Sequence, residues 1–171
     1  LVRSYKLRGA YNMMCQLAPD QLANGVVCAS AGNHAQGFAY SCSQLGVKGV
    51  VFMPVITPRQ KVSQTKMFGG DNITIVLTGD NFDECALAAK EYTMAHAMTF
   101  IPPFDDFRII EGQGTVAKEI LEDLSAIDCL ILPVGGGGLA AGCGYYFKSN
   151  SPHTTIVGVE PEGAPSMKEA L

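Results

Sequence analysis

A lysine with possible nucleophilic chemistry lies at position 6, within residues 4–11 (SYKLRGAY). A lysine amine attacks a carbonyl only when it is neutral, so desolvation, a nearby cation or a helix N-terminus must lower its pKa. Ser4 could cap a helix that begins here and carries apolar residues at helical spacing: Leu7, Ala10, Tyr11, Met14 and Leu17. A surface lysine on a first helical turn would show the same local pattern.

A second motif, residues 29–37 (ASAGNHAQG), follows a short apolar run and opens a helical pattern. The side chains of Ser30 and Asn33, with the N–H groups of the helix start, would suit a carboxylate, because an anion is stabilised there. Two alternatives stay open at this point. Asn33 could only cap the helix, and His34 could only hydrogen-bond locally at the helix start.

The third motif is the glycine loop, Gly135–Gly138, which separates the apolar residues 129–134 from helix-compatible residues 139–148. Four residues without Cβ leave backbone N–H groups bare at a helix N-terminus, which suits a phosphate. A dinucleotide would also fit, since Gly136, Gly138 and Ala141 match G-x-G-x-x-A. Glu160 then stands about 20 residues on, where an acid would bind ribose hydroxyls.

The order of the motifs disfavours the dinucleotide. The glycine loop does not follow the first apolar run of the chain, and that first run already carries its own anion-binding turn at Ser30–Asn33. Two such turns and one lysine together favour a ligand with one phosphate and one carbonyl, bound beside a substrate carboxylate.

Short apolar runs alternate with helical patterns along the whole chain. Such alternation predicts an α/β fold with parallel sheets covered by helices on both faces. The predicted strands are 26–29, 49–53, 73–77, 130–134 and 155–159, and the predicted helices are 33–45, 58–68, 81–96 and 139–148. Thr57 before Pro58, and Asp80, are the expected helix caps. Residues 100–107, with two prolines and no period, are expected to form a loop.

Composition narrows the function classes. The chain has 171 residues, 47% of them hydrophobic, and a net charge of −4 without a basic stripe, so we expect no nucleic-acid partner. No run approaches the about 18 apolar residues of a membrane span. Six cysteines without a C-x-x-C pair predict a reducing compartment, the cytoplasm, with neither disulfides nor a zinc site.

Four motifs in register resemble the threonine dehydratases, in the serine/threonine dehydratase family of fold type II pyridoxal phosphate enzymes. They are residues 4–12 (SYKLRGAYN), 30–37 (SAGNHAQG), 112–115 (GQGT) and 133–139 (PVGGGGL). The resemblance covers essentially the entire chain and includes residues 100–105 (FIPPFD) and 158–161 (GVEP). It implies a two-lobed fold similar to the tryptophan synthase β subunit, with pyridoxal 5'-phosphate as the cofactor.

The resemblance also implies a role for each motif. Lys6 would be the catalytic lysine that binds the cofactor and moves the substrate's Cα proton. Tyr5 would lie against the cofactor ring, Asn33 would bind the phenolic oxygen, and Gly135, Gly136, Gly137, Gly138 and Leu139 would hold the phosphate. The substrate carboxylate would lie against Ser30, Ala31, Gly32, Asn33 and His34.

Two departures from the related serine racemases narrow the expected reaction. In those racemases a serine stands at the position of Ala31 and delivers a proton to the opposite face of the carbanion. This chain lacks that serine, which favours elimination over racemisation. Their divalent-metal site is matched by Glu160 and Ala164, but its acidic ligand is Ser166 here. Because a hard cation needs carboxylate oxygens, we expect no tightly bound metal.

The implied reaction is removal of water from L-threonine, giving 2-oxobutanoate and ammonia, as the first step of isoleucine synthesis. An L-serine dehydratase or serine racemase of the same family is the alternative. A nicotinamide-dependent oxidoreductase and a non-catalytic module are rivals from other classes. The expected partners are a small amino acid and, in a homodimer or homotetramer, further copies of the chain.

The same resemblance implies a division into lobes. Residues 1–29 and 116–171 are expected to belong to the larger, cofactor-binding lobe, and residues 30–115 to the smaller α/β lobe. The catalytic domain is expected to be incomplete in this chain, with its remainder and any regulatory domain lying beyond residue 171.

Overall fold

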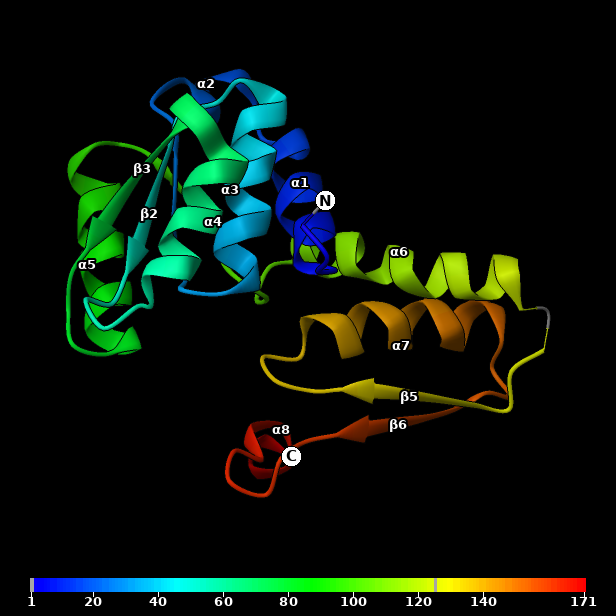
Figure 1. Cartoon of the computed structure of the whole chain (residues 1–171). Helices are drawn as coiled ribbons and strands as arrows, with labels where there is room; N and C mark the ends of the chain where they lie inside the picture. Colours follow the sequence, from blue (N-terminus) through cyan, green and yellow to red (C-terminus); the bar gives the residue numbers. More distant parts are fainter. Residues whose placement is uncertain (1, 125) are drawn as a thin grey trace. The chain divides into compact units, whose positions relative to one another are not determined.

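The computed structural model describes residues 2–124 and 126–171, which form two compact units. The first unit ends at Pro103 and the second begins at Phe104. Both combine helices with parallel strands (Figure 1), so the predicted α/β class is confirmed.

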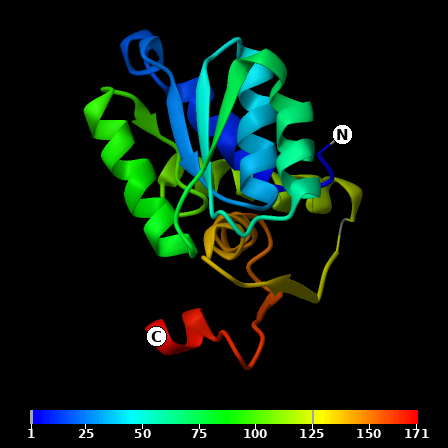
Figure 2. The same ribbon diagram turned by 60° about the vertical axis from the view of Figure 1, so that its left-hand side comes forward.

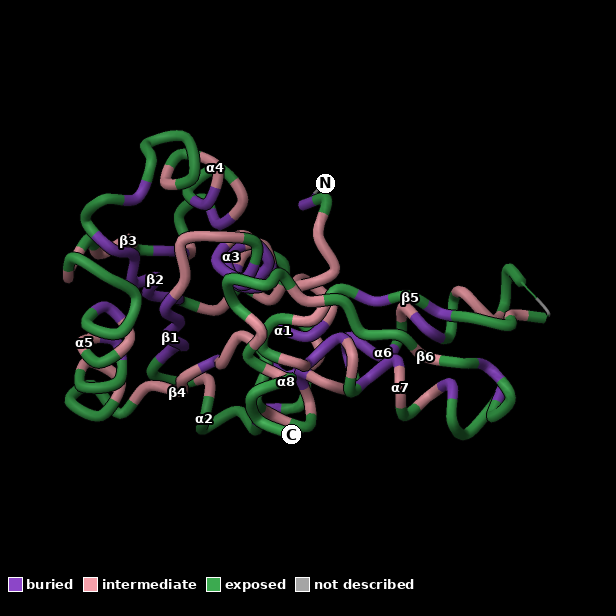
Figure 3. Tube along the Cα trace, turned by 90° about the horizontal axis from the view of Figure 1, so that it is seen from below, coloured by how far each residue is buried: buried purple, intermediate pink, exposed green. Residues whose placement is uncertain are grey.

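The first unit contains a parallel sheet in the order β3-β2-β1-β4. Its strands are β1 (Val26–Ala29), β2 (Gly49–Met53), β3 (Ile73–Leu77) and β4 (Thr99–Phe100). Val26 of β1 aligns with Gly49 of β2 on one side and with Thr99 of β4 on the other. Every residue of β1 and β2 is buried (Figure 3), which explains their near-continuous apolar sequences.

Helices cover both faces of this sheet. Figure 2 shows α5 (Phe82–Ala95) on the side opposite α3 (Asn33–Leu45) and α4 (Arg59–Gly69). On the α5 face the core joins strand and helix residues: Val27, Ala29, Val50, Phe52, Cys85 and Ala89. The remaining helices of this unit are α1 (Lys6–Gln16), α2 (Pro19–Ala23) and the 3-10 turn η1 (Gly70–Asn72).

Helix α1 packs closely against α3. A Cβ added at Gly37 of α3 would lie 2.8 Å from the backbone N and Cα of Leu7, so only glycine allows this approach. The contact holds the first turn of α1, where Lys6 lies, against α3.

The described residues of the second unit form three helices and two strands. Its elements are α6 (Phe107–Asp123), β5 (Cys129–Pro133), α7 (Gly138–Asn150), β6 (Thr155–Val159) and α8 (Ser166–Ala170). Helices α6 and α7 meet at Gly142, where a Cβ would lie 2.7 Å from the amide nitrogen of Gly114. Strands β5 and β6 are parallel. On β5, the side chains of Leu130 and Leu132 are buried.

Several sequence predictions need correction. Pro58, with ψ of 136°, lies outside α4 as its N-cap, so Thr57 does not cap the helix. Helix α5 is capped by Asn81, whose side chain accepts from the Glu84 N–H, and not by Asp80. Helices α2 and α6 and strand β4 were not predicted. The loop predicted at residues 100–107 is shorter in the structure, since β4 ends at Phe100 and α6 begins at Phe107.

The boundary between the two compact units falls after Pro103, because β1 pairs with both β2 and β4 and α6 continues unbroken across residue 115. The assignment of residues 1–29 and 116–171 to one cofactor-binding lobe of a longer domain stays a prediction.

The six cysteines are thiols rather than disulfides, and four of them are buried. Burial raises the pKa of the Cys28 thiol, raises that of Cys42 to about 12 and raises that of Cys85. These thiols therefore pack as small apolar groups. Among the described helices, none has the length and apolar character needed to cross a bilayer.

Candidate functional site

The order of the strands creates a topological switch point in the first unit. The chain runs from β1 to β2 and β3 on one side of β1, and then returns to β4 on the other side. Ligands of open parallel sheets bind at the carboxyl ends of the strands at such a point. The segments that leave these ends are Ser30–Gly32 after β1 and Ile101–Pro103 after β4. The Ile101 N–H donates to the Val27 carbonyl at 2.8 Å and anchors the second segment.

Lys6 contacts this switch point. Its Nζ donates to the carbonyl oxygen of Pro103 at 2.7 Å, and its backbone N–H donates to Ser4 Oγ at 3.2 Å. The side chain is half-buried, and desolvation lowers the pKa of its amine. A larger neutral fraction than in an exposed lysine makes Lys6 suited to attack a carbonyl.

His34 contacts the same segment. Its Nε2 lies 3.0 Å from the carbonyl oxygen of Ile101 and must carry the proton, because a carbonyl only accepts. The expected local hydrogen bond is therefore replaced by one that spans 67 positions of the chain. Burial is the main cause that lowers the pKa of the imidazole to about 4, and the charge of Lys6 adds to it. The His34 ring thus holds the Ile101–Pro103 segment. The backbone N–H of His34, and not its ring, is the group that points toward the start of α3.

The turn after β1 leaves the start of α3 without a side-chain cap. Gly32 is the N-cap residue, so Asn33 is not a cap but the first helical residue, and it is exposed. Ser30 Oγ accepts from the Gly32 N–H at 3.2 Å, which closes a tight turn. An open pocket of about 880 Å³ borders Gly32 and Asn33. Bare N–H groups beside open space suit a small anion such as a carboxylate.

Tyr5 is the N-cap residue of α1, and its ring centroid lies 5.7 Å from Lys6 Nζ. An amine at this distance from an aromatic face is within the range of a cation–π contact. Tyr5 and Ala31 are both half-buried. Within the first unit, Tyr5 and Lys6 therefore lie together at the start of α1. The Ser30–His34 turn lies in the same unit, at the carboxyl end of β1.

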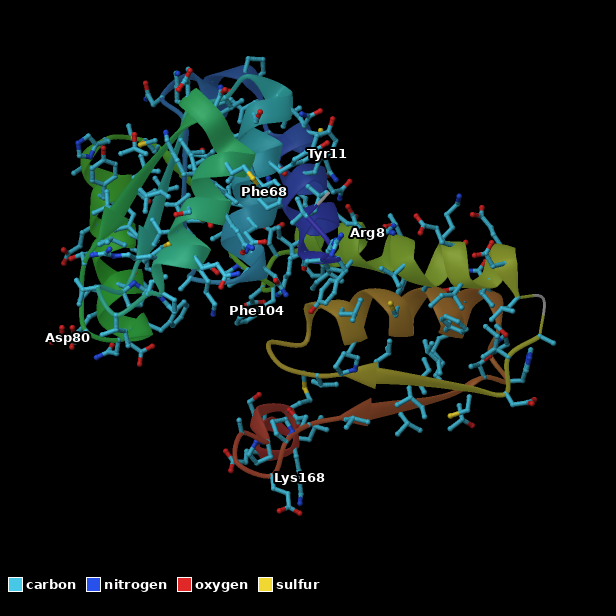
Figure 4. The ribbon with its side chains drawn as sticks, in the orientation of Figure 1. Arg8, Tyr11, Phe68, Asp80, Phe104 and Lys168 are labelled. Atoms are coloured by element: carbon cyan, nitrogen blue, oxygen red, sulfur yellow. The ribbon has the colours of Figure 1, made fainter. Side chains whose placement is uncertain are left out.

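The second unit presents the glycine loop between β5 and α7. Helix α7 has no side-chain cap, and Gly137, with φ of +84°, turns the chain into it. A Cβ at Gly136 would overlap the ring of Phe104, a residue that Figure 4 shows before α6, whereas a Cβ at Gly135 would have no atom within 4 Å. Leu139 is buried and offers only its N–H. Open space before an uncapped helix fits a phosphate group.

Glu160 lies directly after β6 in the same unit. Its Oε1 accepts from the Met167 N–H at 2.7 Å and its Oε2 from the Lys168 N–H at 3.0 Å. Both hydrogen bonds lower the pKa of the Glu160 carboxyl, and the bond from Met167 has the larger effect. Among the described residues no group of three or more His, Cys, Asp or Glu side chains could hold a metal ion. The absence of a tight metal site stays a prediction.

Sequence reasoning missed the carbonyl groups of Ile101 and Pro103 and the ring of Phe104. The two prolines at 102 and 103 indicated only a loop, because backbone acceptors leave no trace in residue types. Their position could have been found only from the pairing of β4 with β1.

The acid stability of the first unit is expected to depend on His34. Because burial lowers its pKa from 6.5 to about 4, the unfolded chain takes up the proton first as the pH falls. The stability contributed by neutral His34 is complete above pH 6.5 and is lost toward pH 4, by about 3 kcal/mol. Hydrogen exchange of β4 and α3 amides in the full-length protein measures it. His34→Gln should flatten this loss, exposed His96→Gln should keep it, and equal slopes in both variants would contradict the assignment.

Comparison with known proteins places these features in a family. Residues 2–171 match the family described as pyridoxal-phosphate dependent enzymes, and the chain belongs to this family. It is 55% identical over 172 residues to the L-threonine dehydratase biosynthetic IlvA of Halalkalibacterium halodurans, covering 100% of this chain and 41% of that protein. The corresponding Staphylococcus saprophyticus enzyme is 55% identical over 97% of this chain and 40% of its own length. The chain thus spans about two fifths of these curated relatives.

Solved structures give the same grouping. The processed form of threonine deaminase isoform 2 from Solanum lycopersicum superposes with a TM-score of 0.92 at 48% identity, over 97% of this chain and 48% of that one. Maize serine racemase gives a TM-score of 0.93 at 31% identity, over 99% of this chain and 50% of that one. The predicted fold type and family are confirmed.

Proposed function

We propose that this chain is the cofactor- and substrate-binding part of a threonine dehydratase, which converts L-threonine into 2-oxobutanoate and ammonia. The observation that carries the proposal is the half-buried Lys6 amine at the switch point, in the same unit as the uncapped turn at Ser30–Asn33. Higher identity to the threonine dehydratases, 55%, than to the maize racemase, 31%, supports threonine as the substrate.

The residues fit pyridoxal 5'-phosphate in their chemistry. The N–H groups of the glycine loop and of Leu139 would hold its phosphate, Asn33 its phenolic oxygen, Tyr5 would lie at its ring, and Lys6 would bond to its carbonyl carbon. When bound, this cofactor supplies an electron sink that acidifies the Cα proton of an amino acid.

The protein's own groups would then perform the elimination. The turn at Ser30–His34 binds the substrate carboxylate through side-chain and backbone donors, and so orients the Cα–H bond. The neutral Lys6 amine would accept the Cα proton and return a proton to the Cβ hydroxyl, which would then leave as water. The released enamine tautomerises and takes up one water, giving 2-oxobutanoate and ammonia. Ala31 carries no proton that could be returned to the opposite face of Cα.

The cellular setting is part of the same proposal. The relatives are named biosynthetic enzymes, and we assign this protein to isoleucine biosynthesis in the cytoplasm, acting as a homodimer or homotetramer. Sedimentation of the full-length holoenzyme would establish the number of subunits.

The decisive assay uses the full-length protein reconstituted with pyridoxal 5'-phosphate. With L-threonine it should release 2-oxobutanoate and ammonia in equal amounts, and with L-serine it should release pyruvate more slowly. A serine racemase is the second candidate, because the maize enzyme shares the fold at a TM-score of 0.93. D-serine formed from L-serine, without 2-oxobutanoate from L-threonine, would replace the proposal by this candidate.

A further inference from the structure

Glu160 is the acidic residue that the dinucleotide hypothesis assigned to a ribose, and the proposed function leaves it without a role. Its carboxylate is directed to the protein's own backbone. The two oxygens accept from the N–H groups of Met167 and Lys168, and Ser166 Oγ lies 3.4 Å from Oε1. One carboxylate therefore organises the first turn of α8, where Figure 4 shows Lys168.

This first turn of α8 lies against the glycine loop. Ser166 Oγ also lies 3.3 Å from the carbonyl oxygen of Gly135, within reach of a hydrogen bond. A Cβ at Gly137 would lie 2.7 Å from Cε of Met167, so the Met167 side chain packs on the loop at its left-handed residue. Two consecutive residues of the turn thus contact two residues of the loop.

Glu160 is itself held firmly beside the beginning of the glycine loop. Val159, its neighbour, aligns with Pro133 at the end of β5, and the Val134 N–H donates to the Val159 carbonyl at 2.9 Å. The loop leaves β5 and Glu160 leaves β6 at the same end of one two-stranded sheet. The carboxylate therefore connects the sheet to the turn that supports the loop.

We propose that Glu160 is a positioning residue for the phosphate-binding glycine loop, acting through Ser166 and Met167. This inference rests on the proposed function, since it assumes that the loop binds the cofactor phosphate. Without the carboxylate, the N–H groups of residues 167 and 168 lose their acceptor and Ser166 and Met167 are no longer held at Gly135 and Gly137. A loop that is free to change its backbone conformation binds phosphate less tightly, because ordering it then costs entropy.

The test compares equilibrium binding of pyridoxal 5'-phosphate and of pyridoxal, which lacks the phosphate, to the full-length apo-protein. Glu160→Ala should weaken pyridoxal 5'-phosphate binding by about tenfold or more, as expected for loss of charge-assisted hydrogen bonds. Pyridoxal binding should stay unchanged and shows that the variant is folded. Glu160→Gln, which keeps one acceptor oxygen, should recover part of the loss. Glu162→Ala, exposed two residues away, is the matched control and should bind both ligands as the wild type does.

The possible results separate the explanations. If Glu160 acted only through its negative charge, which repels the phosphate, both Glu160→Ala and Glu160→Gln would bind pyridoxal 5'-phosphate more tightly than the wild type. The proposal would then be wrong. Equal weakening of both ligands, or no change in Glu160→Ala, would also overturn it. A wild-type protein that binds pyridoxal 5'-phosphate no better than pyridoxal would instead refute the phosphate site and with it the proposed function.

Discussion

Replacing Lys6 by alanine is expected to lower the turnover of L-threonine by about 1,000-fold or more, because the variant loses both the proton acceptor and the covalent attachment of the cofactor. The visible absorption of the lysine-bound cofactor should disappear as well. Lys6→Arg should be equally inactive, since a guanidinium keeps its proton at all working pH values. Steady-state kinetics and absorption spectra of the full-length protein measure both effects.

The matched control for this substitution is Lys90→Ala. Lys90 is exposed on α5, so its variant should keep wild-type turnover and spectrum. The burial that lowers the Lys6 pKa also implies that its amine, when not bonded to the cofactor, loses its proton at a lower pH than an exposed lysine does. Turnover that survives in Lys6→Ala would refute the assignment of this lysine.

The second large effect is expected for Gly135→Ala. A methyl group at Gly135 meets no protein atom within 4 Å, so folding should tolerate it. The group would instead occupy space that the phosphate needs. The affinity for pyridoxal 5'-phosphate should fall by about 10- to 100-fold, the equivalent of one or two charge-assisted hydrogen bonds. Equilibrium dialysis of the full-length apo-protein measures the affinity, and thermal unfolding of the same sample shows whether stability is kept.

Two other glycines serve as comparisons. Gly144 is also free of neighbours within 4 Å but lies inside α7, so Gly144→Ala should leave cofactor affinity unchanged and slightly stabilise the helix. Gly136→Ala would drive a methyl group into the Phe104 ring and should lower stability as well as affinity. Unchanged cofactor affinity in Gly135→Ala would show that the phosphate lies elsewhere.

The predictable part of the fold was the part with a strong local signal. Strands β1, β2 and β3 were predicted residue by residue, because they are short apolar runs bounded by turn residues, and β1 and β2 are also buried throughout. Helix α6 was missed because Gly112 and Gly114 weaken its helical pattern. Gly114 lies where α6 meets Gly142 of α7, and a Cβ there would be 3.1 Å from the Gly142 carbonyl oxygen, a tertiary contact that local propensity does not contain. Strand β4 has only two residues and exists through its pairing with β1.

The candidate site divides in a similar way. Lys6, the Ser30–His34 turn and the glycine loop are recognisable because residue types carry their chemistry. The acceptors that orient Lys6 and His34 are the carbonyls of Pro103 and Ile101, and any residue type supplies a carbonyl. The hydrogen bonds of Glu160 were not predicted for a related reason. Its partners are N–H groups of residues 167 and 168, which become neighbours only once α8 folds back beside the sheet end.

The buried thiols give the first unit a further property. Cys42 lies in α3, Cys28 in β1 and Cys85 in α5, so each of the three layers carries a fully buried thiol. A thiol with a raised pKa inside a packed layer reacts with an alkylating reagent only when that layer opens. The alkylation rates of these three cysteines therefore report how often each layer of the native unit opens locally. No introduced label is needed.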